Sequence, residues 1–416
     1  MTPHLKLPLR KQADVENAWL TERLDTLLPM LMARADLDMW LVIAREYNED
    51  PVIMTLLPQP AMAARRRTIL VFHRQPDGSV ERFQVSRYGH SGYFETVWKP
   101  EDEGQYACLA RIVRERDPQK IGINISKTTA FADGLSHAEH ALLAGALGEY
   151  AERLTSAEAV AVGWLEARID AEMVAYSHAV AMGHHMIARA FSSEVIHPSI
   201  TTTDDVIWWM RQTMHDLGLR AWFQPSITIQ AADITNDAFF GGKKQRKLIM
   251  PGDLLHCDMG FYYLGLATDQ QQHCYIRRAG ETDAPVGLQT ALAVGNQLQN
   301  LHIAQFLPGK TGNEVLHDTL AAMREANING MIYSHPLGYH GHAAGPVIGM
   351  WDQQNGVPEL GDLTLHDNTC WSIELNASVD VPEWGQTVRI ALEEDAMLHD
   401  GKIEWLHGRQ TELHLI

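Results

Sequence analysis

The sequence predicts an α/β (α+β) fold of two domains, and three observations support that prediction. The chain has 416 residues, which is more than a single hydrophobic core usually organises. With 45% hydrophobic and 21% charged residues, its composition is that of an ordinary globular protein and not of a disordered one. Short apolar runs bounded by turn residues alternate with longer segments whose apolar side chains recur at helical spacing.

The first half of the chain, from about residue 15 to residue 160, shows this alternation throughout. Leucines between Leu20 and Leu31 fall at helical spacing, and a charged helix is expected around residues 111–116. Strands are predicted at residues 40–44, 68–72 and 121–124. The charged loop at residues 45–51 follows the first of these strands and is most simply a solvated connector.

Helices dominate the start of the second half. The mixed stripe of small and apolar residues at 170–191 is typical of a packed helix, and another helix begins near Thr203 and ends at Gly218. Thr311 and Glu314 have the spacing of a capping box, which marks the start of a further helix. A helix is also expected at residues 282–306, and strands are expected at residues 223–229, 371–379 and 388–398.

The stretch from Pro251 to His273 predicts a β-hairpin that brings two acids together. Its first apolar run follows a Pro-Gly turn and ends at Asp258, and Asp269 lies in a second apolar run. Acids are rarely buried without a partner, so two of them within apolar strands predict a bound cation. The simpler alternative is that both acids lie at strand ends and face water.

A histidine-rich segment and two glutamate-bearing strands complete a candidate metal site. The residues concerned are His335, His340 and His342, followed by Glu374 and the adjacent pair Glu393 and Glu394. Carboxylates can bridge two cations about 3.5–4 Å apart, and an imidazole suits a borderline transition ion. The order Asp, Asp, His, Glu, Glu therefore indicates a site for two divalent metal ions.

These fragments resemble the creatinase/methionine aminopeptidase superfamily, which has a pita-bread catalytic domain and includes Xaa-Pro aminopeptidase and prolidase. The matching segments are GDL at 252–254, DxG at 258–260, TD at 268–269, GHxxG at 341–345, SIE at 372–374, RI at 389–390 and EED at 393–395. Their order and spacing over about 140 residues carry the resemblance. It implies a creatinase-like N-terminal α/β domain at residues 1–163 and a pita-bread metallopeptidase domain at residues 164–416.

The resemblance also implies a set of metal ligands, namely Asp258, Asp269, His342, Glu374 and Glu393. The family ligand is followed by x-x-Gly, which favours His342, and the preceding Gly341 permits a close approach of the backbone. His340 stays a rival ligand.

Only one of the two adjacent glutamates can enter the site, because neighbouring strand residues point to opposite faces. The family pattern Arg-Ile-Glu-Asp places its arginine and glutamate on one face. Arg389 and Glu393 agree with that alternation and Glu394 does not, so Glu393 is the expected ligand.

Two histidines of the family pattern are absent from their expected positions. The loop at residues 231–242, where the related peptidases place a histidine near the scissile bond, contains none. The family's second histidine lies seven residues beyond the ligand, and counting from His342 leads to Gly349. One oxyanion-type donor contributes about 3–4 kcal/mol at the transition state, so His335 or His340 would have to act as the catalytic substitute.

The implied activity is that of a dinuclear metal-dependent hydrolase of the Xaa-Pro aminopeptidase or prolidase type. A metal-activated water would attack a peptide carbonyl, and Glu374 would carry the proton to the leaving amine. Manganese is the expected ion, with cobalt or zinc as alternatives. The expected partner is a small peptide, in particular one that contains proline, and the resemblance implies a homodimer.

Two other functions stay open. A creatinase-like C–N hydrolase on the same fold would work without metal and use a histidine as the base, although the presence of all five ligand types argues against it. A non-catalytic peptide-binding homologue would keep the fold for recognition alone, and the two absent histidines favour that alternative.

Charge and cysteine usage argue against several other classes. The net charge of −18 makes nucleic acid an unexpected partner, because phosphate backbones are bound by clustered Lys and Arg. No run approaches the roughly 18–20 apolar residues of a membrane span, and the N-terminal residues show no secretory signal. The four cysteines lack metal-binding spacing, which is typical of a reduced, cytoplasmic chain.

Overall fold

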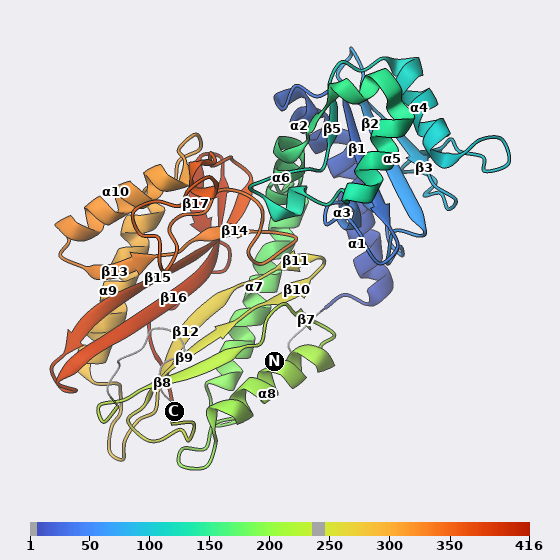
Figure 1. Ribbon diagram of the computed structural model, residues 1–416. Coiled ribbons are helices and arrows are strands. Elements are labelled where there is room, and N and C mark those ends of the chain that lie inside the picture. The colour runs from blue at the N-terminus through green and yellow to red at the C-terminus, as the bar shows by residue number, and fades with distance from the viewer. Residues whose placement is uncertain (1–5, 235–245) are drawn as a thin grey trace. The chain divides into compact units, whose positions relative to one another are not determined.

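The computed structural model describes residues 6–234 and 246–416 of the chain. This part of the chain divides into two compact units (Figure 1). The first unit covers Leu7–Ile169, and the second covers Asp170–Ile416 together with Lys6. The boundary expected after residue 163 lies inside helix α6 (Glu158–Glu166), and the units separate where helix α7 (Asp170–Ala190) begins.

The first unit contains a mixed sheet and a set of helices. Its strands are β1 (Met39–Arg45), β2 (Arg67–Arg74), β3 (Val80–Val85), β4 (Glu95–Thr96), β5 (Ile121–Ile123) and β6 (Leu154–Ser156). Its α-helices besides α6 are α1 (Leu9–Glu22), α2 (Leu28–Arg34), α3 (Ile53–Leu56), α4 (Gln105–Arg116) and α5 (His137–Leu147). The strand order is β4-β3-β2-β1-β5-β6, antiparallel through β1, β2 and β3 and parallel from β1 through β5 to β6. The strands and the charged helix predicted for this half are confirmed.

The core of the first unit lies between its sheet and helices α4 and α5. Every residue of β1 before Arg45 is buried, as expected for a strand that is covered on both faces. Leu109 and Ile112 of α4 and Leu143 of α5 join the same apolar cluster. The unit therefore has a hydrophobic core of its own.

The second unit contains a larger sheet, on which the candidate site is built. Its strands are β8 (Ser226–Gln230), β9 (Leu254–Met259), β12 (Gln270–Tyr275), β13 (Asn329–Ile332), β14 (His335–Leu337), β15 (Thr369–Val381), β16 (Gln386–His399), β17 (Lys402–Trp405) and β18 (His414–Leu415). The order is β13-β15-β16-β12-β9-β8, with β14 also paired to β15, β17 to β16 and β18 to β12. A small separate sheet contains β7 (Arg220–Ala221), β10 (Phe261–Tyr263) and β11 (Leu266–Ala267).

Two of the four α-helices described in the second unit, α8 (Thr203–Asp216) and α10 (Gly312–Glu325), begin at a capping box. The other two are α7 and α9 (Val286–Ile303). The predicted capping box of Thr311 and Glu314 is confirmed, since each side chain bonds the backbone N–H of the other. A second box, between Thr202 and Asp205, caps α8, which begins at Thr203 as predicted.

Alternation along β15 and β16 separates an apolar face from an acidic one. Ile373, Leu375 and Leu392 join a buried cluster with leucines of α9, which packs on these two strands. Glu374 and Glu393 occupy the alternate positions, so they point away from that cluster. The apolar face secures the strands, and the other face is left for the acids.

The predicted hairpin between Pro251 and His273 is confirmed. Strands β9 and β12 pair antiparallel with Asp258 opposite Gln271, and the residues between them form β10 and β11. Within the described ranges, no helix combines the length and apolar character needed to cross a membrane.

Candidate metal centre

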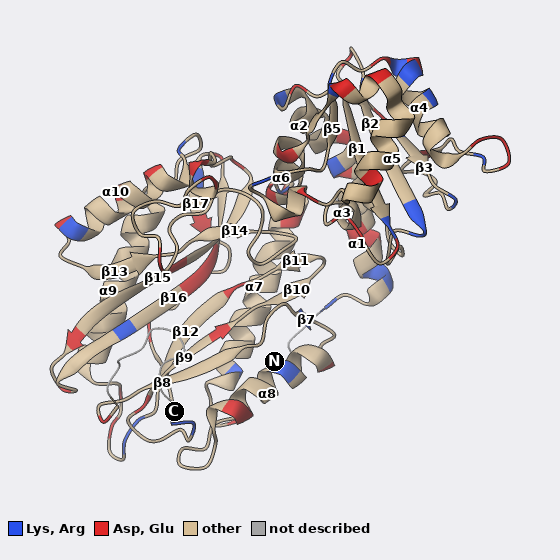
Figure 2. Ribbon diagram, in the orientation of Figure 1, with Lys and Arg blue, Asp and Glu red and all other residues tan. Residues whose placement is uncertain are grey.

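Four side chains form a row across the large sheet. Asp258 of β9 is paired with Gln271 of β12, Gln271 with Glu393 of β16, and Glu393 with Glu374 of β15. Directly paired residues on neighbouring strands project to the same face, so this register brings three acids and an amide together. Figure 2 shows the acidic positions of these strands lying close together on the sheet.

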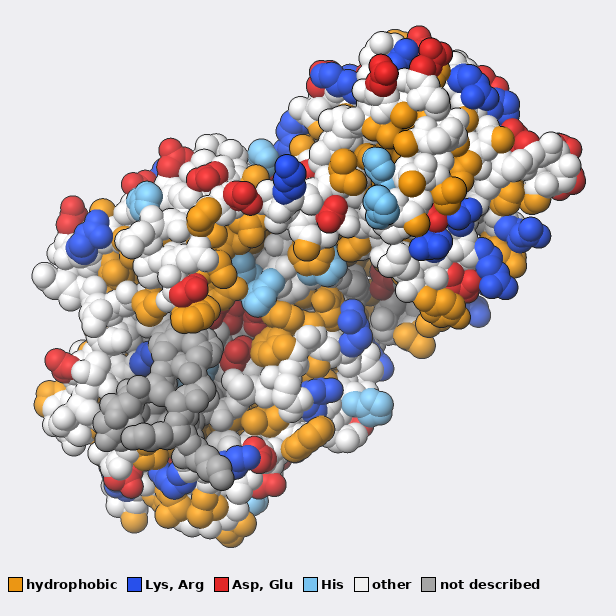
Figure 3. All heavy atoms as spheres, viewed as in Figure 1, with side chains coloured by type: hydrophobic (Ala, Val, Ile, Leu, Met, Phe, Trp, Pro, Cys, Tyr) orange, Lys and Arg blue, Asp and Glu red, His pale blue; other side chains and the backbone are white. Residues whose placement is uncertain are grey.

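Two more side chains reach this row from positions beside it. Asp269 precedes Gln271 by two positions and therefore shares its face. His335 of the short strand β14 is paired with Ser372, which in turn precedes Glu374 by two positions. The space-filling view shows acidic side chains beside histidines over this sheet (Figure 3).

The potential ligand atoms of these residues converge. Three sets have all their ligand atoms within 4.8 Å of one another: Asp258, Asp269 and Glu393; His335, Glu374 and Glu393; and Asp269, His335 and His342. Asp269, His335 and Glu393 each belong to two of these sets. Overlapping sets that share a carboxylate are the arrangement that a pair of bridged cations requires.

Several of these buried atoms have no hydrogen-bond partner among residues 6–234 and 246–416. They are Oδ1 of Asp258, Oδ1 of Asp269 and Nε2 of His335. Buried polar groups are almost always hydrogen-bonded, and an unpaired one costs about 1–3 kcal/mol. Asp269 shares one converging set with Asp258 and another with His335, and all three residues could donate electron pairs to cations, so divalent metal ions fit the site.

The electrostatics of the cluster lead to the same conclusion. Burial raises the pKa of Asp258, Asp269 and Glu374 well above the ordinary range, and the negative charge of Glu393 adds to the effect on each. Burial acts on Glu393 too, but the neighbouring His335, Ser372 and Gln271 outweigh it and lower the pKa of Glu393. Four carboxyl groups in one dry site repel one another when ionised, and positive ions would relieve that repulsion.

Gln271 is a site residue that the sequence did not reveal. Its Nε2 donates to Glu374 Oε1 at 3.0 Å and to Glu393 Oε2 at 2.6 Å, and its Oε1 lies 2.8 Å from His256 Nε2. Burial lowers the pKa of His256 to about 3, so this imidazole is neutral and donates its Nε2–H to the amide oxygen. The signal in the sequence is its spacing, two positions after Asp269, which places it on the same face of the strand.

Two further polar residues near the ligands were also missed. The Ser372 hydroxyl donates to Glu393, and the carboxylate of Asp395 accepts a bond from the backbone N–H of Asp269 at 3.2 Å. Ser372 lies two positions from Glu374, and Asp395 lies two positions from Glu393. Strand alternation therefore predicts that each shares a face with the neighbouring predicted acid.

The three histidines of the 335–342 segment occupy different places. His335 is 2% exposed, with its Nε2 3.6 Å from Glu393 Oε1 and 3.8 Å from Asp269 Oδ2. The side chain of His342 is exposed, its ring centre lies 4.7 Å from that of His335, and its Nε2 lies 3.4 Å from the Tyr333 hydroxyl. His340 belongs to none of the converging sets found among the described residues.

The spacing rule that led to His342 applies equally well to His335. His335 is followed by Pro336, Leu337 and Gly338, which is also His-x-x-Gly, and the residue seven positions beyond it is His342. Counted from His335, the family's second histidine is therefore present. Gly349 has φ +70° and its Cβ would lie 2.3 Å from the Ile332 carbonyl oxygen, so the backbone accounts for this glycine.

The two adjacent glutamates point to opposite sides of β16. Glu393 faces the acid cluster, whereas Glu394 bonds to His184 Nε2 at 2.5 Å, Gln272 Nε2 at 2.8 Å and the Gln410 N–H at 2.9 Å. Glu394 is thus fully engaged away from the cluster. The segment from Asn236 to Phe240, which lacks the family's upstream histidine, lies outside the described residues.

The fold and the acid-lined site define a protein of the creatinase/methionine aminopeptidase superfamily, with the pita-bread fold. The chain belongs to metallopeptidase family M24, whose family model matches residues 174–396. That membership supports a metal-dependent peptidase activity. A search of curated proteins found no significant match to the sequence.

Solved structures with the same fold cover nearly the whole chain. An X-Pro aminopeptidase from Thermotoga maritima MSB8 matches with a TM-score of 0.65 and 15% identity, over 92% of this chain and 98% of that one. An Xaa-Pro dipeptidase from Bacillus anthracis matches with a TM-score of 0.62 and 16% identity, over 95% and 100%. The N-terminal domain of the FACT complex subunit SPT16 from chickpea, Cicer arietinum, matches with 0.55 and 11%, over 98% of each chain.

Proposed function

We propose that the chain is a dinuclear metallopeptidase that hydrolyses small peptides of the Xaa-Pro type. The observation that carries this proposal is that Asp258, Asp269 and His335 each have a buried ligand atom with no hydrogen-bond partner among the described residues, and that each belongs to a converging set with Glu393 or Glu374. The structures of an X-Pro aminopeptidase and an Xaa-Pro dipeptidase share the fold, and they suggest the substrate class.

We assign the metal ligands as Asp258, Asp269, His335, Glu374 and Glu393. The assignment replaces His342 with His335, because His335 is the buried histidine and belongs to two of the three converging sets. Four carboxylates and one imidazole favour manganese and are compatible with cobalt or zinc. Two such ions, when bound, lower the pKa of a water between them and polarise the peptide carbonyl.

Glu374 is the residue we assign to proton transfer. Burial and the neighbouring charge of Glu393 raise the pKa of Glu374, which favours uptake of a proton that this carboxylate can then release to the departing amine. The Gln271 amide fixes one of its oxygens, so the other is free to carry the proton. A carboxyl group anchored on one side and open on the other suits a proton shuttle.

His342 is the residue we assign to the substrate carbonyl or to the charge that develops on it. Its side chain is exposed, and burial of the ring still lowers its pKa to about 4, so the imidazole is neutral at pH 7. A neutral imidazole has one N–H to donate, and the Tyr333 hydroxyl can bond the other nitrogen. His340, outside the converging sets, is left without a catalytic role in this proposal.

Metal analysis of the purified protein tests the proposal. We expect about two ions per chain after incubation with Mn²⁺ and removal of excess, and loss of both in Asp258→Asn. Asp352→Asn, which changes an exposed acid of the same unit, should keep them. Retention of the same metal content in Asp258→Asn would refute the site.

Activity assays separate the proposed function from its rivals. We expect cleavage of Xaa-Pro dipeptides or Xaa-Pro-Yaa tripeptides with added Mn²⁺, abolished by chelation, and slower cleavage of matched Xaa-Ala peptides. Hydrolysis that survives exhaustive chelation would favour a creatinase-like, metal-independent reaction. Saturable peptide binding without product would favour a binding protein.

A further inference from the structure

Four arginines surround one hollow on the first unit of this acidic chain. The hollow has a volume of about 550 Å³ and is lined by Arg45, Arg66, Arg67, Arg87, Tyr88, Trp98 and Gln105. The whole chain has a net charge of −18, so a cluster of guanidinium groups runs against its average composition. Figure 2 marks arginine and lysine positions in blue, including those at the ends of the strands of this unit.

The backbone brings these arginines together in an unfavourable way. Arg45 at the end of β1 is directly paired with Arg67 at the start of β2, and like charges in such pairs repel one another. Arg66 and Arg67 are neighbours in the chain, and both line the hollow. In a regular strand, neighbouring side chains would point to opposite faces. Arg66 has φ +58°, and this left-handed conformation breaks the alternation.

Two hydrogen bonds with Glu46 stabilise the left-handed conformation of Arg66. The backbone N–H of Glu46 donates to the Arg66 carbonyl at 2.7 Å, and the Arg66 N–H donates to Glu46 Oε2 at 3.2 Å. Strained residues of this kind cluster at binding sites. The bonds to Glu46 thus hold Arg66 in a left-handed backbone conformation that places its side chain at the hollow, although that conformation is unfavourable for an arginine.

Positive charge in the hollow exceeds the negative charge that contacts it. The buried carboxylate of Glu139 binds both Arg67, at 2.8 Å, and Arg45, at 3.3 Å. Glu46 lies 3.5 Å from Arg66. Glu46 also lies 4.0 Å from Arg65, outside the hollow. Three of the four arginines that line the hollow thus contact a carboxylate, but their four positive charges exceed the two negative charges by two.

Most of the donors around the hollow are also unused. Within the described part of the chain, the guanidinium groups of Arg45, Arg66 and Arg87 donate no hydrogen bond, and Arg87 forms no ion pair. Arg67 differs, because Glu139 and Gln105 accept from it. Arg45 and Arg66 each contact one carboxylate without a hydrogen bond, so guanidinium donors of three arginines can still bond a ligand in the hollow.

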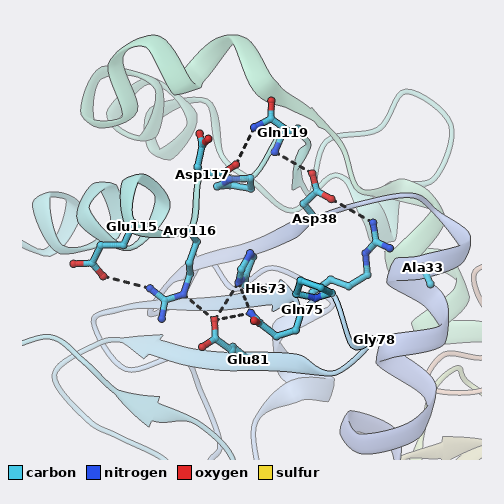
Figure 4. Close-up of a pocket in the computed structure, with 13 residues that line it drawn as sticks. Ala33, Asp38, His73, Gln75, Gly78, Glu81, Glu115, Arg116, Asp117 and Gln119 are labelled. Atoms are coloured by element: carbon cyan, nitrogen blue, oxygen red, sulfur yellow. Dashed lines mark hydrogen bonds and ion pairs between the residues drawn. The ribbon is translucent and has the colours of Figure 1, made fainter.

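A second hollow of the same unit shows the contrast. It has a volume of about 770 Å³, and its charged groups satisfy one another (Figure 4). Glu81 accepts from Arg116 at 2.9 Å and from Gln75 at 2.9 Å, and Arg74 donates to Asp38 at 3.3 Å. That hollow needs no outside anion.

We propose that the arginine hollow binds a small phosphate-bearing anion. The planar guanidinium fork matches phosphate oxygens with two parallel hydrogen bonds, and the net excess of two positive charges matches a dianion. Trp98 lines the same hollow beside the charge, as does Tyr88, whose ring carries the Arg65 guanidinium 4.6 Å from its centre. The volume lies in the range of small-molecule sites. Inorganic phosphate and phosphate esters share this chemistry.

Titration calorimetry of the full chain with inorganic phosphate and with phenyl phosphate tests the proposal. We expect saturable binding of at least one of them, weakened about tenfold or more in Arg66→Ala and in Arg87→Ala. Arg87→Lys keeps the positive charge but loses the forked donors of the guanidinium group, so its affinity should lie between those of the parent protein and Arg87→Ala. Tighter binding of phenyl phosphate identifies an ester as the ligand, and equal binding identifies the free ion.

Two controls make the result decisive. Arg10→Ala removes an exposed positive charge of α1 outside the hollow and should not change the affinity. Asp258→Asn should not change it either, which separates this site from the acid cluster. Absence of saturable binding up to about 10 mM ligand, or an equal loss in Arg10→Ala, would overturn the proposal. Melting temperatures of the variants show whether each protein is folded.

Discussion

Replacing Gln271 with leucine removes the amide that holds the two glutamates of the acid cluster. Its bonds to Glu374, at 3.0 Å, and Glu393, at 2.6 Å, lie inside a buried site. Hydrogen bonds to charged groups contribute about 1.5–3 kcal/mol each, and residues behind metal ligands typically change metal affinity by about 10- to 100-fold. We therefore expect Gln271→Leu to weaken Mn²⁺ binding by about 10- to 100-fold, since leucine fills similar space but removes one hydrogen bond from each glutamate and leaves Ser372 as a donor to Glu393.

The neighbouring glutamine provides a matched control. Gln272 is also buried, and it donates to Glu394 at 2.8 Å and bonds His414 Nε2 at 2.9 Å, but it lies on the opposite face of β12. Gln272→Leu should lower thermal stability about as much as Gln271→Leu does and leave metal affinity unchanged. Calorimetric titration of chelator-treated protein with Mn²⁺, with a melting curve for each variant, measures both quantities.

Two results would refute this reasoning. If Gln271→Leu bound Mn²⁺ as tightly as the parent, the glutamates would be held without the amide. If Gln272→Leu lost as much affinity as Gln271→Leu, the loss would reflect general destabilisation and not the orientation of the ligands.

Three further predictions follow from the same geometry. His335→Ala should lose bound Mn²⁺, whereas His342→Ala should retain it and lose about 3 kcal/mol of transition-state stabilisation in kcat/KM; the reverse pattern would exchange their roles. Burial raises the pKa of Glu166 to about 8 from an ordinary 4.5, against the lowering effect of Arg34 and Arg168, so the folded state binds this proton more tightly than the unfolded state. The free energy of unfolding should therefore fall as pH rises from 4.5 to 8. Glu166→Gln should remove up to about 5 kcal/mol of this decrease, measured by denaturant unfolding at pH 5 and pH 9. Equal decreases in the parent and in Glu166→Gln would contradict the prediction. Leu392→Ala should cost about 2–5 kcal/mol in unfolding free energy, because it opens the contact with α9, and a change under about 1 kcal/mol would show that this contact contributes little.

In long regular strands, the sequence alone was enough to predict which side chains face the core and which face the candidate site. In β15 and β16 the apolar residues occupy one parity, so Ile373 and Leu392 identify the packed face and Glu374 and Glu393 the open one. The same parity directs Glu394 to His184 on the other side. Helix starts marked by a capping box were equally readable, because the box is a local hydrogen-bond pattern.

The sequence could not predict which histidine lies in the acid cluster, because the segment that contains the histidines has no long regular strand. β14 has only three residues, and the turns after it have no period, so no face could be assigned to His340 or His342. The x-x-Gly rule fits two histidines in this segment, and only burial distinguishes His335 from His342. Gln271 was missed because a neutral amide carries no charge signal, although its parity matched that of Asp269.

Parity alone cannot assemble the site, because a slip of two residues between strands keeps every side chain on its face. Such a slip would move a ligand by about 7 Å along the strand, which is beyond the reach of a shared cation. The register of β15 with β16 is fixed by an unbroken ladder from Thr369 and Leu398 to Val381 and Gln386, closed by the short turn at 382–385. The apolar cluster under that ladder therefore positions Glu374 opposite Glu393, and damage to the cluster should reach the metal site through register before it reaches any ligand directly.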